Sequence, residues 1–115
     1  METIQLNSLD HLNDVTANHA NVLLIVSRNA CPGCDALAKA LQNSALLQDA
    51  LAGVTVGIAK IESIPTIIST FGLRQAPTMI LFKDDEEVSR LTGFTAPAPL
   101  VEALHKAFTS VAQAA

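Results

Sequence analysis

The stretch Val22-Leu-Leu-Ile-Val-Ser-Arg-Asn-Ala-Cys-Pro-Gly-Cys34 decides the fold. Its first half is a short apolar run, which is typical of a strand buried on both faces of a sheet. Its second half places Pro32 inside the first turn of a helix, a position that proline favours. We therefore expect a buried strand that leads into a helix, with the two cysteines where the helix begins.

The other segments alternate between strands and helices. Further strands are expected over residues 3–6, 54–61, 78–83 and 87–92, which are apolar, β-branched or alternating in polarity. Strand–helix–strand crossovers require parallel strands, whereas a turn as short as Asp84-Asp85 joins an antiparallel pair. The sequence therefore predicts an α/β fold with a central mixed β-sheet and helices on both faces.

Four helices follow from caps and apolar spacing. They are expected after Ser8, over residues 32–52 with Gly53 just past the end, over residues 64–71 before Gly72, and after Pro97 and Pro99. The last helix would turn an apolar face inward and fray at its end, residues 111–115. That face comprises Leu100, Leu104, Phe108 and Val111.

Composition narrows the classes of function. The chain has 115 residues, 50% of them hydrophobic, so it can fold as one domain over residues 1–115 without a stabilising disulfide or metal. No apolar run approaches the ~18–20 residues of a membrane span, and the N-terminus lacks the pattern of a secretory signal. We therefore expect a cytoplasmic protein with no membrane partner. A formal charge of −4 and only four aromatic residues, all Phe, argue against nucleic-acid binding.

The two cysteines are expected to have a chemical role rather than a structural one. A bridge between Cys31 and Cys34 would constrain the unfolded chain little, and a structural disulfide does not persist in a reducing cytosol. The first turn of a helix carries unpaired N–H groups and a partial positive charge, which lowers the pKa of a thiol placed there. We expect Cys31 to be partly exposed and to attack, and Cys34 to lie one turn inside and to resolve the mixed disulfide.

Two other interpretations of this pair remain open. The cysteines could be inert, or they could form half of a metal site. Zinc requires four ligands, and the only histidines, His11, His19 and His105, fall on two separate expected helices and do not pair closely. We therefore expect no metal, and an iron–sulfur cluster shared by two chains is a similarly weak candidate.

Three sequence blocks, taken together, resemble the thioredoxin family over nearly the whole chain. The first is the apolar strand that leads into Cys31-Pro-Gly-Cys34. The second and most specific is Phe71-Gly-Leu-Arg-Gln-Ala-Pro-Thr-Met-Ile-Leu-Phe-Lys83, which looks like the family's helix end, active-site proline and following strand. The third is Leu91-Thr-Gly93, which resembles the close of the last strand.

The resemblance implies a disulfide oxidoreductase that needs no cofactor. Pro77 would be the cis-proline facing the cysteines, although a plain strand-start proline is also possible at this position. The backbone of Ala76 would pair with an extended substrate strand. The implied substrate-binding residues are Ala30, Pro32, Gly33, Ala76, Thr92 and Gly93. The implied partners are protein disulfides and a thiol reductant system, either a reductase or glutathione.

The sequence departs from the family beneath and around the cysteines. Ile25 stands where thioredoxin has a buried Asp that moves the proton of the resolving thiol, and Ala30 stands where the family usually has Trp. Without that Asp, activation of Cys34 would depend on water or on Lys60, which matches the lysine paired with the family's Asp. Lys60 could equally extend into solvent at a strand end.

Two further departures lie in the helix after the cysteines. Asp35 favours the helix dipole but repels a nearby thiolate, and Lys39 replaces the family's mid-helix proline.

Two functions are therefore open. The leading one is a cytoplasmic oxidoreductase that reduces protein disulfides, with Cys31, Cys34, Pro77 and Lys60 as its catalytic residues. The alternative is a thioredoxin-fold binding module whose cysteine pair is weakly active or regulatory.

Overall fold

The computed structural model describes residues 2–108, so Val111 and the predicted frayed end at 111–115 lie outside the described residues. Five strands form one mixed sheet in the order β1-β3-β2-β4-β5. The strands β1 and β2 run parallel to β3, whereas β4 is antiparallel to β2 and to β5. The strands are β1 (Glu2–Gln5), β2 (Asn21–Ser27), β3 (Thr55–Lys60), β4 (Thr78–Lys83) and β5 (Glu86–Thr92).

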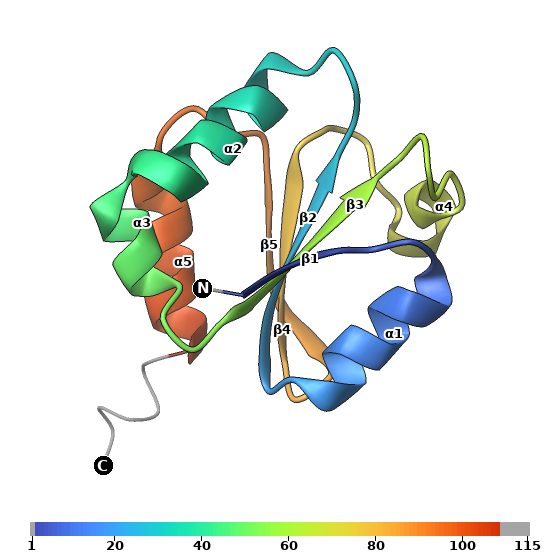
Figure 1. Cartoon of the computed structure of the whole chain (residues 1–115), viewed down its shortest axis with the longest axis horizontal. Coiled ribbons are helices and arrows are strands. Elements are labelled where there is room, and N and C mark those ends of the chain that lie inside the picture. Colours follow the sequence, from blue (N-terminus) through green and yellow to red (C-terminus); the bar gives the residue numbers. More distant parts are fainter. Residues whose placement is uncertain (1, 109–115) are drawn as a thin grey trace.

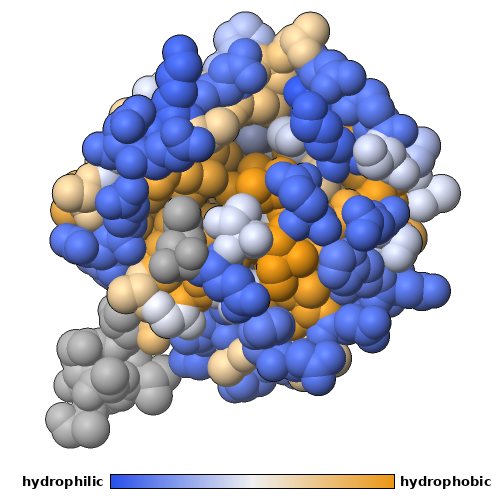
Figure 2. Space-filling view, in the orientation of Figure 1, coloured by the Kyte–Doolittle hydropathy of each residue, from blue (hydrophilic) through white to orange (hydrophobic). Residues whose placement is uncertain are grey.

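Helices cover both faces of this sheet (Figure 1). On one face lie α2 (Pro32–Asn43), α3 (Ala45–Ala50) and α5 (Pro97–Phe108), and on the other lie α1 (Leu9–Asn18) and α4 (Ile67–Phe71). The predicted α/β fold is confirmed. In the space-filling view, hydrophobic residues are seen mainly between the two helical layers, and hydrophilic residues cover their outer sides (Figure 2).

The apolar run of β2 forms the centre of two separate cores, because alternate side chains of a strand point to opposite faces. Leu23 and Ile25 pack with Leu37 of α2 and Leu104 of α5. The intervening residues Val22, Leu24 and Val26 pack on the other face, in the core that α1 and α4 complete. Burial on both faces explains why the run shows no alternation of polar and apolar residues.

Three predicted helices are wrong in extent. The last helix begins at Pro97 itself, because proline is suited to the first turn of a helix. The helix expected over residues 32–52 is broken at Ser44, whose backbone is extended (φ −91°, ψ 107°) and whose hydroxyl accepts a hydrogen bond from the Leu47 N–H at 3.2 Å. A serine in this conformation starts a new helix, α3. The helix expected from Ile64 begins only at Ile67, because the residue before Pro65 is disfavoured from helical backbone angles.

The β4–β5 hairpin combines a tight turn with a bulge. Lys83 pairs with Glu86, and the two turn residues between them, Asp84 and Asp85, have φ of +51° and +69°. Two successive positive φ values match the twist of the flanking strands, and Asp tolerates them. The register shifts between Leu81 and Phe82, which leaves Val88 as an extra residue on β5.

None of the helices within residues 2–108 is both long enough and apolar enough to cross a bilayer.

Candidate active site

The two cysteines lie where β2 passes into α2, as predicted. Cys31 is the N-cap of α2, and its sulfur accepts a hydrogen bond from the Cys34 N–H at 3.1 Å. Cys31 and Cys34 form a disulfide, with their Cα atoms 5.2 Å apart. A sulfur atom therefore takes the place of the Ser or Asp oxygen that usually satisfies the first free N–H groups of a helix.

Cys31 is not partly exposed, as the sequence suggested; in the disulfide form it is only 2% exposed, and Cys34 is 8% exposed. The physical reason is the capping geometry, because the Cys31 side chain folds back over the first turn of α2 to reach Cys34. The neighbouring residues Ala30 and Pro32 are the exposed ones. A reacting group must therefore enter a recess to reach either sulfur.

The peptide bond between Ala76 and Pro77 is cis, as the family resemblance implied. Pro77 lies against the cysteine motif, since a Cβ added to Gly33 would stand 3.1 Å from Cδ of Pro77 and 3.5 Å from the carbonyl oxygen of Phe94. Pro77 is also tied to the end of β5, because its carbonyl accepts from the Gly93 N–H at 2.8 Å. Three segments that are distant in sequence therefore meet beside the disulfide.

Next to this meeting point is a hollow of about 330 Å³ between the cis-proline loop and the start of α5. Thr92, Gly93 and Phe94 at the end of β5 line the hollow, and so does Gln75 of the cis-proline loop. Gly93 has a φ of +78°, and a Cβ placed there would meet Nε2 of Gln75 at 2.9 Å. The site therefore contains the predicted substrate-binding residues Thr92 and Gly93, together with Gln75, which the sequence analysis did not single out.

A polar clamp holds the loop before Cys31. The Asn29 N–H donates to Oε2 of Glu62 at 3.0 Å, and Nζ of Lys60 donates to Oδ1 of Asn29 at 2.9 Å. Nη1 of Arg28 donates to the carbonyls of Asn29 and Ala30 at 3.1 and 2.8 Å. These contacts hold Ala30 in a left-handed conformation, with φ of +51°, a region that alanine rarely adopts.

The clamp also shifts the titration of Glu62. The hydrogen bond from the Asn29 backbone N–H is the main cause that lowers the pKa of the Glu62 carboxyl, and the charges of Lys60 and Arg28 act in the same direction. Hydrogen bonds to a carboxylate favour its charged form. At neutral pH the clamp is therefore a charged network on an exposed loop.

Lys60 and Ile25 are not brought together. Lys60 is exposed at the end of β3, with its ammonium group on Asn29, whereas Ile25 is 4% exposed within the apolar core beneath α2. Asp35 and Lys39 are both exposed on α2. The side of the sheet that Ile25 faces has no charged residue in its described core.

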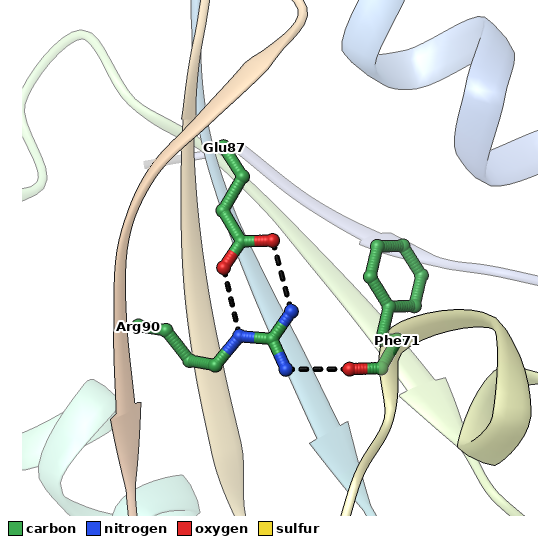
Figure 3. Close-up of polar contacts among 3 residues, drawn as sticks. All are labelled: Phe71, Glu87 and Arg90. Carbon is green, nitrogen blue, oxygen red and sulfur yellow. Dashed lines mark hydrogen bonds and ion pairs between the residues drawn. The ribbon is translucent and has the colours of Figure 1, made fainter.

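Arg90 of β5 holds the last residue of α4, from which the chain continues toward Pro77 (Figure 3). Its guanidinium donates to both carboxylate oxygens of Glu87, at 2.7 and 2.9 Å, and to the carbonyl of Phe71 at 2.6 Å. Residues three apart on a regular strand point to opposite faces, so the bulge at Val88 is what puts Glu87 and Arg90 on one face. Phe71 ends α4 and packs edge-on against Phe82.

The histidines do not assemble with the cysteines. His11 accepts from the Asn7 N–H, and His19 pairs with the Thr55 hydroxyl. Among residues 2–108, no group of three or more His, Cys, Asp or Glu could hold a metal ion.

Several residues of the site carried no recognisable signal in the sequence. Asn29 and Glu62 are 33 positions apart, and Arg90 and Phe71 are 19 positions apart. Neither spacing indicates a contact before the sheet order is known. Arg28 and Arg74 could have been found by the charge they place beside Cys31 and Pro77 in an otherwise acidic chain.

The structure combines three features: a five-stranded mixed sheet, a disulfide at a helix N-terminus and a cis-proline that packs against the cysteine motif. Together they define the class of thioredoxin-like folds. The thioredoxin-like domain family matches residues 10–108, and the chain belongs to that family. Thioredoxin of Chlamydia caviae is 29% identical over 76 residues, which are 66% of this chain and 72% of that protein.

Solved thioredoxin structures agree with the fold. The N21Q mutant thioredoxin from Halobacterium salinarum superposes with a TM-score of 0.76 at 23% identity, covering 91% of this chain and 89% of that one. Thioredoxin from Trypanosoma brucei brucei gives a TM-score of 0.82 at 13% identity, covering 94% and 92%. The thioredoxin-like fold that the sequence predicted is therefore confirmed.

Proposed function

We propose that the protein is a thiol–disulfide oxidoreductase, a single thioredoxin-like domain that reduces disulfides of cytosolic proteins. The observation that carries this proposal is the Cys31–Cys34 disulfide at the N-terminus of α2, with a helix N–H directed at the Cys31 sulfur. In the reduced protein the same N–H and the helix dipole favour the thiolate of Cys31 over the thiol. Family membership supports this class of activity.

The reaction we propose runs from the reduced to the oxidised protein. The Cys31 thiolate attacks one sulfur of a substrate disulfide, and the other substrate sulfur leaves and takes up a proton. Cys34 then loses its proton and attacks Cys31, which releases the second substrate thiol and forms the Cys31–Cys34 disulfide. Two electrons pass from the cysteine pair to the substrate, and a thiol reductant system, either a reductase or glutathione, restores the pair.

The surrounding residues support substrate binding beside the disulfide. We propose that the Ala76 and Gly93 backbones pair with an extended substrate segment, while Pro77 and Gly33 close one side of the recess. Ala30, Pro32 and Thr92 are exposed around it and would contact the same segment. Lys60 would act indirectly, since its ammonium group holds Asn29 in the loop that carries Ala30 and Cys31.

Reduction of insulin by dithiothreitol, with and without the protein, tests this function. We expect wild type to accelerate the reaction and Cys31→Ser to be inactive. With dithiothreitol removed, pre-reduced Cys34→Ser should accumulate a mixed disulfide between Cys31 and insulin. In the reduced wild type, Cys31 should be alkylated before Cys34 at neutral pH. Faster alkylation of Cys34 would reverse the two roles.

The alternative, a binding module, is favoured by the apolar Ile25 of β2, beneath α2, and by the recess that holds Cys31. A binding module would give no acceleration over dithiothreitol alone. It would also bind a partner equally well with both cysteines replaced by serine. An oxidoreductase would accelerate the reaction over dithiothreitol alone, and replacing both cysteines by serine would weaken its binding to the partner.

A further inference from the structure

A second cavity, of about 280 Å³, also borders the cis-proline loop, since Gln75 lines both this cavity and the hollow at Gly93. We call it the basic pocket, because Arg28 and Arg74 both line it. Ile68 of α4 and Ala76 of the cis-proline loop form further parts of its wall. The pocket therefore combines two guanidinium groups with an apolar wall.

The basic pocket is lined by residues of the two loops that lead into Cys31 and Pro77. Arg28 is hydrogen-bonded to the carbonyl of Ala30, the residue before Cys31. Arg74 lies in the same loop as Ala76, the residue before Pro77, and Pro77 packs against Gly33 of the cysteine motif. A substrate segment paired with Ala76 would therefore have one of its side chains within reach of this pocket.

The two arginines have hydrogen-bonding capacity left for a ligand. The side-chain hydrogen bonds of Arg28 use only Nη1, so Nε and Nη2 still have N–H groups to donate. Arg74 makes no hydrogen bond or ion pair with any other residue of the described range 2–108. The acidic side chain of the clamp, Glu62, accepts from the Asn29 N–H and forms no ion pair with either arginine in the described range.

The basic pocket carries positive charge, whereas the chain as a whole has a net negative charge. The chain has seven Lys and Arg against eleven Asp and Glu, yet Arg28, Lys60 and Arg74 all lie at this end of the sheet. Guanidinium groups pair well with carboxylates because their planar donors match the two oxygens. A carboxylate is therefore the ligand that fits two arginines above an apolar wall.

We propose that the basic pocket binds a Glu or Asp side chain next to the reactive cysteine of a protein disulfide, and so selects acidic substrates. This inference rests on the oxidoreductase function proposed above. The reaction and its electron balance are unchanged, and the arginines act on substrate binding.

The test uses mixed disulfides between 2-mercaptoethanol and a single-cysteine peptide. Three peptides carry Glu, Gln or Lys at one position beside the cysteine, and a second set places the same residues on its other side. The pre-reduced protein is the only reductant, and the second-order rate constant of its single turnover, which corresponds to kcat/KM, is measured for each peptide. We expect the Glu peptide of one set to exceed its Lys counterpart by about tenfold, since each arginine should add about two- to fivefold, the usual strength of an exposed ion pair.

Variants assign the preference to the pocket. Arg28→Gln and Arg74→Gln should each reduce the Glu-to-Lys ratio by about two- to fivefold, and the double variant should bring it close to one. Arg28→Lys and Arg74→Lys keep the charge and should keep most of the ratio. Lys83→Gln removes one positive charge at the opposite end of the sheet and should leave the ratio unchanged. At about 1 M salt the ratio should also fall, because screening shortens to about 3 Å.

Each outcome decides between the two proposals. Equal kcat/KM for all peptides, or a preference that survives in the double variant, would overturn the basic pocket and leave the oxidoreductase intact. Failure to reduce any peptide would overturn the oxidoreductase and the pocket together. Thermal melts of every variant separate a loss of fold from a loss of selectivity.

Discussion

At one end of the sheet, β4 returns as β5 through only Asp84 and Asp85, in a turn fixed by its own backbone angles. At the other end, the loops before Cys31 and before Pro77 are longer, and side chains from elsewhere hold them. The first end has four consecutive acidic residues, 84–87, and the second has Arg28, Lys60 and Arg74. Local sequence therefore suffices to make a turn, whereas the reactive end requires contacts between distant residues.

The largest expected effect comes from a charge placed beneath the reactive end. Ile25→Asp should lower the free energy of unfolding by about 3–5 kcal/mol, because an unpaired charge would be buried and Lys60 is turned toward Asn29. The same carboxylate should accelerate insulin reduction at neutral pH if it accepts the proton of Cys34, a form of catalysis worth up to about 10²–10⁴.

Ile25→Asn is the matched control, since it has a similar shape but cannot accept that proton. Insulin reduction and thermal melts of both variants check the prediction. Loss of stability with no gain in rate for Ile25→Asp would show that proton transfer beneath Cys34 does not limit the reaction.

The two ends can be compared at glycines with the same backbone conformation. Gly93 at the reactive end has φ of +78°, and Gly53 at the other end has φ of +77° with nothing near its absent Cβ. Alanine at either position should cost about 1–2 kcal/mol of stability, because L-residues are strained there. Only Gly93→Ala should also lower kcat/KM for peptide disulfides, since its methyl group would displace Gln75 and narrow the groove. Equal activity in the two variants would mean that Gly93 does not line the binding surface.

A smaller effect is expected where Arg90 holds the end of α4, just before the cis-proline loop. Arg90→Lys loses the planar fork that joins Glu87 to the Phe71 carbonyl, which should cost about 1 kcal/mol. Amide hydrogen exchange should become faster at Leu73, whose N–H bonds the Ile68 carbonyl, but not at Asp84, whose N–H bonds the Ala20 carbonyl. Faster exchange at both sites would indicate a global loss of stability instead of a local one.

The smallest effect concerns the charge of Glu62. Because folding lowers the pKa of Glu62, its contribution to stability is present at neutral pH and is lost as the pH falls through the folded-state pKa. Glu62→Gln should therefore have a slightly lower Tm than wild type at neutral pH, and the two Tm values should converge in acid. Melts across this pH range check the sign, and a difference that grows in acid would contradict it.

The sequence predicted the parts of the molecule that depend on neighbouring residues. The apolar run of β2, the proline of α2 and the Ser8 cap each lead to the observed element, and the Ser8 hydroxyl accepts from the His11 N–H. The break at Ser44 was missed because no glycine or proline marks it, although a serine before Ala45 is a suitable N-cap.

The remaining features depend on distant pairings. The burial of Cys31 follows from the way its side chain turns back over α2, and the contact between Arg90 and Glu87 follows from the bulge. Neither can be derived from spacing along one segment, because each requires the register or the rotamer of the folded chain. The prediction of a cis bond before Pro77 rested on the family resemblance and not on local propensity.

The bulge at Val88 also bears on how the protein behaves at high concentration. β5 is an edge strand, and an edge strand with free N–H and carbonyl groups is a template for pairing with another chain. The extra residue interrupts the regular spacing of those groups, and Glu86, Glu87 and Arg90 place charges along the same edge. One irregularity therefore both aims Arg90 at Phe71 and protects the molecule against edge-to-edge aggregation.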